Sequence, residues 1–406
     1  MSQETMPNWL DQRASLTPDR TALEYSGEKI TFFELRERAR KTAGKFAALS
    51  VAKGHFVALL LENGVRTVEI IHALEYVGAV IVPLNTRLTD DELRFQLEDS
   101  GATLLVYDES FAEKAEKAAQ PLQYVMSISA KNLYEQPEAN IPLTTEIRLD
   151  DLHTVMYTSG TIGHPKGVML TYGNHWWSAV GSALNLGLVA HDRWLCCVPM
   201  FHMSGLSIVM RSVIYGMTVV VHPTFHPEKI NEAIQTERIT IVSVVSAMLA
   251  RMIDCLDGAY PPSFRCMLLG GGPAPKPLLE ACRKKQIPVF QTYGMTETAS
   301  QIVTLSSDYM LTKLGSAGKP LFPCEVTIEK DGRTAKCGEI GEIVVKGPNV
   351  TKGYLHREEA TNEAIKNGWL YTGDLGYFDE EGFLYIVERR NDLIISGGEN
   401  VYPAEI

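Results

Sequence analysis

TVMYTSGTIGHPKGVML, residues 154–170, places an apolar run directly before a loop rich in glycine and hydroxyl groups. Residues 154–157 are apolar and β-branched, a composition that predicts a buried strand. Residues 158–167 contain three glycines and a proline, so we expect a loop there and no regular element. The sequence therefore predicts a core strand that ends in a polar, glycine-rich loop.

The chemistry of this loop suits an anion. Glycines let backbone N–H groups approach phosphate oxygens, hydroxyl groups donate further hydrogen bonds, and Lys166 supplies a positive charge. The loop is not the Walker pattern, because Gly167 follows the lysine where that pattern has Ser or Thr. A plain surface loop is the alternative, but the order of these groups favours phosphate binding. The candidate phosphate-binding residues are Thr158, Ser159, Gly160, Thr161, Gly163 and Lys166.

The segment YTSGTIGHPKG resembles the phosphate-binding loop of the adenylate-forming superfamily, which contains acyl-CoA synthetases, luciferases and peptide-synthetase adenylation domains. The resemblance implies that ATP activates a carboxylate as an acyl-adenylate, with Mg²⁺ as the metal. In one respect the chain departs from the family pattern, since Ile162 stands where a second threonine is usual. Loss of that hydroxyl donor would cost about 1–3 kcal/mol if a charged oxygen stayed unpaired, and water or a backbone N–H can replace it.

Composition bounds the class of protein. The chain has 406 residues, of which 45% are hydrophobic and 21% charged, enough for two or three packed lobes. A net charge of −11 argues against a nucleic-acid partner. The seven cysteines form no CxxC pair, which indicates reduced thiols and no zinc site. Without a signal pattern or a membrane-length apolar run, we expect a cytoplasmic protein with no membrane insertion. A homo-oligomer is compatible with the sequence.

The first part of the chain predicts alternating strands and helices. Thr31 and Glu34 have the spacing of a helix capping box. Strands at 56–61 and 80–84 flank a helical pattern at 69–76, which predicts a right-handed βαβ unit. After a helix within 85–97, a further strand is expected at 103–107, and the polar stretch 108–149 is expected to be a surface connection.

The remainder predicts a second α/β lobe and then a change of pattern. A helix is expected at 174–186, and short apolar runs at 194–198, 218–222, 239–245, 265–269 and 288–292 alternate with helices. From 314 onwards, alternating strands with Gly and Asp turns predict a small β-rich subdomain. The expected fold is α/β, with two lobes of largely parallel sheet over 1–312 and the β-rich subdomain over 313–390. Together they would form a large adenylation domain over 1–390.

Two loops that follow predicted strands are nucleotide-site candidates, because ligands of α/β sheets bind beyond the carboxyl ends of strands. The glycine triplet at 270–272 could be only a tight turn, but the resemblance implies that Gly271, Gly272 and Pro273 pack against adenine. Asp374, in a Thr-Gly-Asp motif, could be an ordinary turn residue. The resemblance implies that Asp374 accepts the ribose hydroxyls and that Arg389 contacts ribose or phosphate.

The segment QTYGMTET, residues 291–298, combines an aromatic ring, hydroxyls and one carboxylate. A carboxylate near ATP is explained by Mg²⁺, which prefers oxygen ligands. The resemblance implies that Glu297 holds Mg²⁺, that Thr296 faces the α-phosphate and that Tyr293 stacks near the base. Gly294 and Met295 would complete this side of the nucleotide site. The alternative is a helix-capping threonine beside a solvated glutamate.

His202 lies at a predicted strand-to-helix turn, PMFHMSGL, where a histidine can simply cap a helix. The position matches the acyl-pocket motif of the superfamily, which implies a pocket and catalytic role for His202. Ser204, Gly205 and Ser300 are further candidates for the substrate pocket. The chain therefore offers a polar pocket for a carboxylic acid next to its nucleotide site.

The segment RRNDLIISGGEN, residues 389–400, resembles the hinge and first loop of the superfamily's mobile C-terminal domain, with Asn391 at the hinge. Residues 391–406 are then expected to be the hinge and a stub of that domain. The family's catalytic lysine lies farther on, so we expect a truncated chain that is impaired in adenylation but still binds the acyl-adenylate.

Five longer segments extend the resemblance to bacterial acid–thiol ligases of menaquinone biosynthesis: GNHWWSAVGSALNLGL, FHMSGLSIVMRSVIYGMTVVVH, LLGGGPAPKPLLE, QTYGMTETASQIVTL and KLGSAGKPLFPCEV. The implied function is ligation of an aromatic keto-dicarboxylic acid to CoA, with CoA as co-substrate. The alternatives are another acyl- or aryl-CoA ligase, or a module that only binds ATP or an acyl-adenylate. An amino-acid-adenylating domain would need an acidic residue where this chain has His202.

Overall fold

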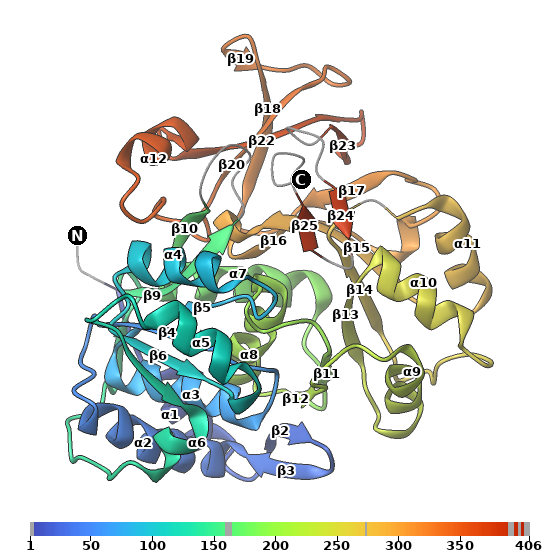
Figure 1. Ribbon diagram of the computed structural model, residues 1–406. Coiled ribbons are helices and arrows are strands. Elements are labelled where there is room, and N and C mark those ends of the chain that lie inside the picture. The colour runs from blue at the N-terminus through green and yellow to red at the C-terminus, as the bar shows by residue number, and fades with distance from the viewer. Residues whose placement is uncertain (1–3, 159–164, 273, 389–393, 397–398, 402–406) are drawn as a thin grey trace.

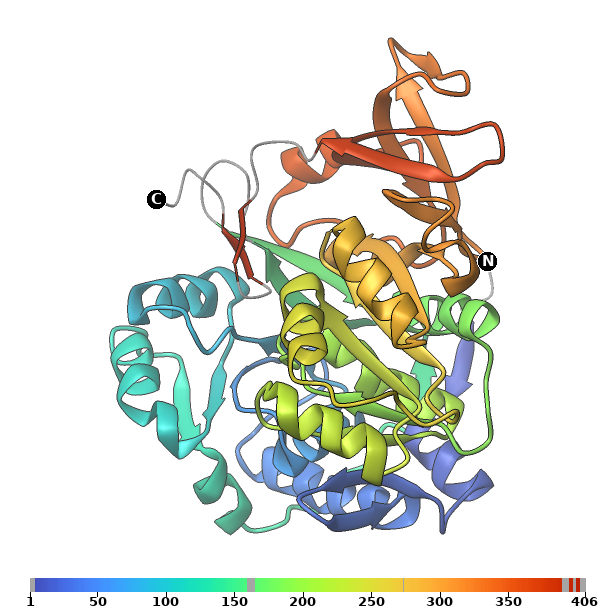
Figure 2. The same cartoon turned by 90° about the vertical axis from the view of Figure 1, so that its right-hand side faces the viewer.

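The computed structural model describes residues 4–158, 165–272, 274–388, 394–396 and 399–401. Two α/β lobes lie side by side, and a group of antiparallel strands projects from them (Figure 1). Figure 2 shows these orange and red strands rising above the lobes. The predicted α/β class with a β-rich part is confirmed. The domain boundaries at 313 and 391 stay predictions.

The first lobe contains a six-stranded sheet in the order β10-β9-β5-β4-β6-β7. Strands β4 and β5 pair in parallel on either side of α3, which confirms the predicted βαβ unit. Helix α2 begins after the capping box that Thr31 and Glu34 form. The elements here are β1 Thr5–Pro7, α1 Trp9–Leu16, α2 Phe32–Ala48, β4 Phe56–Leu60, α3 Val65–Val77, β5 Val80–Pro83, α4 Asp90–Ser100, β6 Leu104–Tyr107, η1 Glu109–Phe111, α5 Ala112–Ala119, β7 Met126–Ser129, α6 Ala130–Glu135, β8 Glu146–Arg148, β9 Leu152–Thr158 and β10 Lys166–Thr171.

Two expectations for this lobe are wrong. Residues 108–149 are not a plain surface connection, since β7 pairs in parallel with β6 and α5 buries Ala115 and Ala118 completely. This region contains alanines and a short polar strand, and it lacks the regular spacing of large apolar residues by which helices and strands are predicted. The predicted loop 158–167 is also shorter than expected, because Lys166 and Gly167 begin β10, which pairs antiparallel with β9 from Thr158 onwards.

The second sheet continues from one lobe into the antiparallel strands. Its parallel part has the order β15-β14-β13-β11-β12-β2, and β16, β17, β23, β22, β20, β18 and β19 extend it on the other side. Figure 1 shows α9, α10 and α11 beside β13, β14 and β15. The N-terminal hairpin of β2 and β3, which sequence reasoning did not predict, closes the far edge.

The elements of this second sheet and its helices begin with β2 Thr21–Tyr25, β3 Glu28–Thr31, α7 Tyr172–Leu186, β11 Arg193–Cys196, α8 Met203–Tyr215, β12 Thr218–Val221, α9 Pro227–Thr236, β13 Ile241–Val245, α10 Ser246–Asp254, β14 Cys266–Gly270, α11 Lys276–Lys284, β15 Val289–Met295, η2 Thr296–Thr298, β16 Ser300–Leu305 and η3 Ser307–Tyr309. They continue with β17 Ser316–Pro320, β18 Glu325–Lys330, β19 Arg333–Thr334, β20 Gly341–Lys346, α12 Glu358–Ala364, β21 Ile365–Lys366, β22 Trp369–Phe378 and β23 Leu384–Glu388. A separate pair is formed by β24 Ile394–Ser396 and β25 Glu399–Val401. None of the described helices combines the length and apolar character that a bilayer crossing requires.

A buried ionic cluster supports strand β9. The Glu75 carboxylate on α3 lies 2.8 Å from His72 Nδ1 and 2.9 Å from His153 Nε2, and its side chain is 1% exposed. Burial alone would raise the pKa of Glu75. The adjacent His72 charge and the hydrogen bonds from both histidines outweigh burial and lower the pKa to about 2. One residue beyond His153, Thr154 Oγ1 lies 3.0 Å from His175 Nε2, so this cluster holds the strand that leads to the predicted phosphate loop.

The low pKa of Glu75 predicts a pH dependence of stability. The ionised carboxylate stabilises the fold fully above its unfolded pKa, near 4.5, and this contribution of about 3 kcal/mol is lost as the pH falls toward 2. We expect Glu75→Gln to unfold more easily at pH 7 and to show a flatter dependence of unfolding free energy on pH below 5. Urea unfolding at a series of pH values measures both effects. Parallel pH curves for wild type and variant would contradict this role.

Candidate active site

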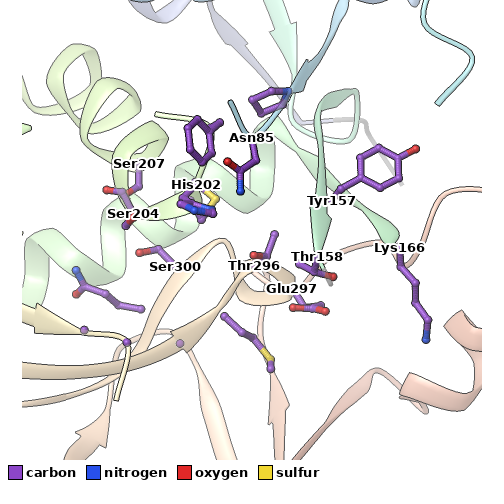
Figure 3. Close-up of a pocket in the computed structure, with 18 of the residues that line it drawn as sticks. Asn85, Tyr157, Thr158, Lys166, His202, Ser204, Ser207, Thr296, Glu297 and Ser300 are labelled. Atoms are coloured by element: carbon purple, nitrogen blue, oxygen red, sulfur yellow. The ribbon is translucent and has the colours of Figure 1, made fainter. Parts of the chain in front are cut away.

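A cleft of about 620 Å³ lies where β9, β10, β15, α8 and β22 come together. Figure 3 shows two groups of side chains along it: Ser204, Ser207 and Ser300 beside His202, and Thr158, Thr296 and Glu297 toward Lys166. The predicted site residues that line the cleft are Thr158, Lys166, His202, Ser204, Gly271, Gly294, Met295, Thr296, Glu297, Ser300 and Asp374. The structure therefore brings together the motifs that sequence reasoning selected from distant parts of the chain.

Other predicted site residues lie elsewhere. The lining that the described residues form does not include Gly205, Gly272 or Tyr293. A Cβ on Gly205 would stand 2.3 Å from the carbonyl oxygen of Pro199, so this glycine is needed for packing at the start of α8. The predictions for Ser159, Gly160, Thr161, Gly163, Pro273, Arg389 and Asn391, and the departure at Ile162, fall outside the described residues.

Lys166 and Glu297 face one another across a tyrosine. The Lys166 ammonium lies 5.0 Å from the ring centroid of Tyr354, and the Tyr354 hydroxyl donates to Glu297 Oε1 at 3.1 Å. Burial raises the pKa of Glu297, with Asp374 adding to the rise, while hydrogen bonds from its own backbone and from Tyr354 oppose it. The hydrogen bond from Tyr354 therefore orients the Glu297 carboxylate at the wall of the cleft.

The turn that carries Glu297 is fixed by its own backbone. Gly294 forms an irregular pairing with β16, and a Cβ at this position would lie 1.9 Å from the carbonyl oxygen of Ser300. Only glycine fits such an approach. Thr298 Oγ1 accepts from the N–H of Met295 at 3.1 Å, and Asn349 donates to the carbonyl of Thr298 at 2.9 Å. The motif therefore presents Thr296 and Glu297 from a rigid turn.

Tyr293 has a different place from the one expected. Its ring is only 3% exposed, and its hydroxyl donates to Asp374 Oδ2 at 2.7 Å. The burial of the ring gives no support to the prediction that it stacks near the base. Asp374 itself lines the cleft from β22, and a carboxylate has two oxygens that can accept hydrogen bonds. Tyr293 thus orients the carboxylate that was predicted to bind ribose.

The glycine loop after β14 also reaches the cleft. Gly270 and Gly271 are part of its wall, and Gly271 has a φ of +83°, a conformation that favours glycine. A Cβ on Gly271 would come within 3.1 Å of Val245 Cγ1. The loop therefore offers a surface of bare backbone, as the proposed contact with a flat base requires.

His202 stands at the beginning of α8, where it is the N-cap residue without a side-chain capping hydrogen bond. Its ring packs against Phe201 with centroids 4.7 Å apart. Both residues line the cleft, so the alternative of a helix-capping histidine is not supported. Ser204 and Ser207 follow on the same helix and line the same end of the cleft.

Arg211 was missed by the sequence reasoning. It lies two turns into α8, is 2% exposed, and nevertheless belongs to the same cleft lining as Ser207 and Gln301. Its guanidinium lies 5.3 Å from the Trp194 ring, while its Nε and Nη2 atoms have no hydrogen-bond partner in the described part of the chain. Burial lowers the pKa of Arg211, but arginine stays charged in proteins. The only hint of this guanidinium in the sequence is a single arginine at a buried position of the otherwise apolar helix α8.

Comparison with known proteins accounts for this combination of the paired strands β9 and β10, the turn that carries Glu297 and the cleft wall beside His202. The pattern of the AMP-binding enzyme family matches residues 10–355. The chain belongs to the AMP-binding enzyme family. It is 59% identical to the 2-succinylbenzoate–CoA ligase of Geobacillus sp. (strain WCH70) over 406 residues, which are 100% of this chain and 81% of that relative.

Solved structures agree with this membership. The o-succinylbenzoate CoA synthetase of Bacillus subtilis in complex with the acyl-adenylate intermediate OSB-AMP has a TM-score of 0.92 and 52% identity, covering 99% of this chain and 82% of that one. The same enzyme in complex with ATP and magnesium ion has a TM-score of 0.92 and 52% identity, covering 99% and 83%. The AMP-binding fold that the sequence predicted is thereby confirmed.

The cleft of this AMP-binding family member suits a nucleotide with a divalent cation. The described residues contain no group of three or more His, Cys, Asp or Glu side chains that could hold a metal by themselves. Glu297 offers a single carboxylate in a cleft that also holds the Lys166 ammonium. Mg²⁺ is commonly bound by one or two carboxylates together with substrate phosphates, so this donor set fits a metal that arrives with ATP.

Proposed function

We propose that this chain is a 2-succinylbenzoate–CoA ligase of menaquinone biosynthesis. The reaction converts 2-succinylbenzoate, ATP and CoA into 2-succinylbenzoyl-CoA, AMP and diphosphate. The proposal is supported by 59% identity across the chain to a ligase of that name and by the likeness to the Bacillus subtilis enzyme. The observation that carries it is a cleft with Lys166 and Glu297 at one end and the buried, partly unpaired Arg211 at the other.

The charge of Arg211 suits a substrate with two carboxylates. One carboxylate must reach the nucleotide to react, and the other would be left in the buried acyl end of the cleft, where an uncompensated charge is costly. The Arg211 guanidinium, whose Nε and Nη2 have no hydrogen-bond partner among the described residues, can bind it through a charge-assisted pair. This feature favours a dicarboxylic acid over the fatty or simple aryl acids of the alternative acyl-CoA ligases.

The first half of the reaction joins the acid to the nucleotide. A carboxylate oxygen of the substrate attacks the α-phosphorus of ATP, and the bond from that phosphorus to the diphosphate oxygen breaks. Lys166 and the hydroxyls of Thr158 and Thr296 stand where they can neutralise and orient the phosphates. Asp374, held by Tyr293, is proposed to fix the ribose, while the Gly270–Gly271 backbone lies against the adenine.

The second half of the reaction transfers the acyl group to CoA. The CoA thiolate attacks the acyl carbon, the mixed anhydride C–O bond breaks, and AMP leaves. His202 and Phe201 form the wall next to the acyl group and exclude water from the anhydride. A rotation of a C-terminal domain about Asn391 is the hinge-type step expected here, and it stays a prediction.

Mg²⁺, when bound with ATP, neutralises charge on the phosphates. Glu297 is the residue proposed to hold it, which leads to a direct prediction for Glu297→Gln. The glutamine amide has the shape of the carboxylate but lacks its negative charge. The half-saturating Mg²⁺ concentration for ATP binding should therefore rise at least about 10-fold. Loss of a residue that only supports a metal ligand already lowers metal affinity roughly 10- to 100-fold, and Glu297 is proposed to contact the metal itself. Calorimetric titration of ATP at increasing Mg²⁺ measures this. An unaltered Mg²⁺ dependence would remove the assignment.

A panel of acids tests the proposed activity. With 2-succinylbenzoate, ATP, Mg²⁺ and CoA, a form of the enzyme extended over the full length of its relatives should release AMP and form the CoA thioester, both detectable by liquid chromatography with mass detection. Amino acids and long-chain fatty acids should give little product. AMP formation of similar rate with all of these acids would overturn the proposal. Cytoplasmic location and a homo-oligomeric state stay predictions from the sequence.

A further inference from the structure

Tyr354 is a side chain that contacts both Lys166 and Glu297 at the nucleotide end of the cleft. It lies between β20 and α12, in a segment that no motif in the sequence singled out. Its hydroxyl donates to Glu297 Oε1 at 3.1 Å, and its ring centroid lies 5.0 Å from Lys166 Nζ. Tyr354 itself lines the cleft. One side chain therefore contacts a cation through its face and an anion through its hydroxyl.

The backbone around Tyr354 holds this position firmly. Leu355 donates to the carbonyl of Gly167 at 2.8 Å, and Gly353 accepts from Met169 at 3.0 Å, so the segment is attached to β10 on both sides of the tyrosine. The N–H of Tyr354 donates to Thr361 Oγ1 at 2.9 Å.

The same segment also reaches the turn of Glu297. The N–H of Thr351 donates to the carbonyl of Glu297 at 2.8 Å. Residues 351–355 thus connect the strand of Lys166 to the turn of Glu297.

Opposite charges in one cleft would attract each other when no nucleotide is present. Such a pair would have to be broken before Lys166 could meet a phosphate and Glu297 a metal. In the described part of the chain, no ion pair within 4.0 Å joins Lys166 to Glu297, although the Lys166 charge acts on the carboxylate through space and lowers its pKa. The aromatic face can hold the ammonium by cation–π attraction, and the phenol can hold the carboxylate by a charge-assisted hydrogen bond.

We propose that Tyr354 is a positioning residue that holds Lys166 and Glu297 apart, each ready for Mg·ATP. The inference rests on the proposed nucleotide site. It assigns the two halves of the tyrosine to different tasks: the ring positions the ammonium for the phosphates, and the hydroxyl positions the carboxylate for the metal.

Two variants separate these tasks. Tyr354→Phe keeps the ring and should raise the half-saturating Mg²⁺ concentration for ATP binding about 3- to 10-fold, with ATP affinity at saturating Mg²⁺ nearly unchanged. Tyr354→Leu removes the ring as well and should additionally weaken ATP binding at saturating Mg²⁺ by about 3- to 10-fold. Combined with Lys166→Ala, this second loss should disappear, because the ring acts through the lysine. Tyr377→Phe, on a tyrosine stacked against Tyr385 away from the cleft lining, is the matched control and should change neither quantity.

The contrast between the Mg²⁺ dependence of ATP binding and the ATP affinity at saturating Mg²⁺ is a readout that a merely structural role of Tyr354 would not separate.

Calorimetric titration of ATP at several Mg²⁺ concentrations, with melting temperatures to verify folding, decides the matter. Wild-type protein that fails to bind Mg·ATP would refute the nucleotide site itself. Two results would overturn only the role of Tyr354, provided that wild-type protein binds Mg·ATP normally. One is an unchanged Mg²⁺ dependence in Tyr354→Phe. The other is that the effects of Tyr354→Leu and Lys166→Ala on ATP binding simply add in the double variant.

Discussion

Lys166→Ala is expected to lower kcat/KM for ATP by about 100- to 1,000-fold, because it removes a fixed positive charge from the place where phosphate charge develops. Lys166 is the first residue of β10, and its strand is held by pairing with β9, so the alanine variant should keep the fold. The affinity for 2-succinylbenzoate should change by less than about threefold, since the acid binds at the other end of the cleft.

Steady-state kinetics with ATP and the acid varied in turn measure this contrast. Lys352→Ala is the matched control, because Lys352 is attached next to the same hairpin but lies outside the cleft lining. Unchanged KM and kcat for ATP in Lys166→Ala would contradict the assignment of the phosphate site. An equal loss in the control would indicate a structural effect instead.

Arg211→Met should reduce kcat/KM for 2-succinylbenzoate by about 100- to 1,000-fold, the cost of leaving a buried carboxylate without its partner. The sharper expectation concerns selectivity. 4-Oxo-4-phenylbutanoate is the same acid without the ring carboxylate, so wild-type enzyme should use it poorly, and Arg211→Met should use the two acids about equally. Methionine has a volume suited to this site and leaves no unpaired charge, so the melting temperature should not fall.

Arg251→Met on α10 is the control, since this arginine contacts Phe225 outside the cleft lining. A loss of kcat/KM that is equal for both acids would show that Arg211 does not bind the ring carboxylate of the substrate. The comparison of two acids in two proteins therefore distinguishes recognition from general damage.

The sequence was most informative where periodicity and local chemistry agree. The βαβ unit around α3 was predictable because apolar strands flank a helical pattern, and the turn of Thr296 and Glu297 because its residue types are unusual together. The 108–149 region was misread because alanine helices and short polar strands are stabilised by neighbours that the sequence does not place. The hairpin β9–β10 was hidden for a similar reason, since Lys166 and Gly167 join a strand only through pairing with β9.

Several site features depend on contacts between distant segments. Arg211 becomes a candidate ligand only when α8 places it at the wall of the cleft, and Tyr354 only when residues 351–355 connect β10 with the turn of Glu297. Tyr293 was expected at the base because of its motif, but its pairing with Asp374 is set by the meeting of β15 and β22. No local pattern contains such information.

A crystal structure of the protein with bound 2-succinylbenzoyl-adenylate tests the central claim most directly. The account predicts ligand density in the cleft, with the phosphate between Lys166 and Thr296, the ribose at Asp374 and the free carboxylate within hydrogen-bond reach of Arg211. Density for the adenylate outside this cleft, or inside it with the acyl group turned away from Arg211, would contradict the account.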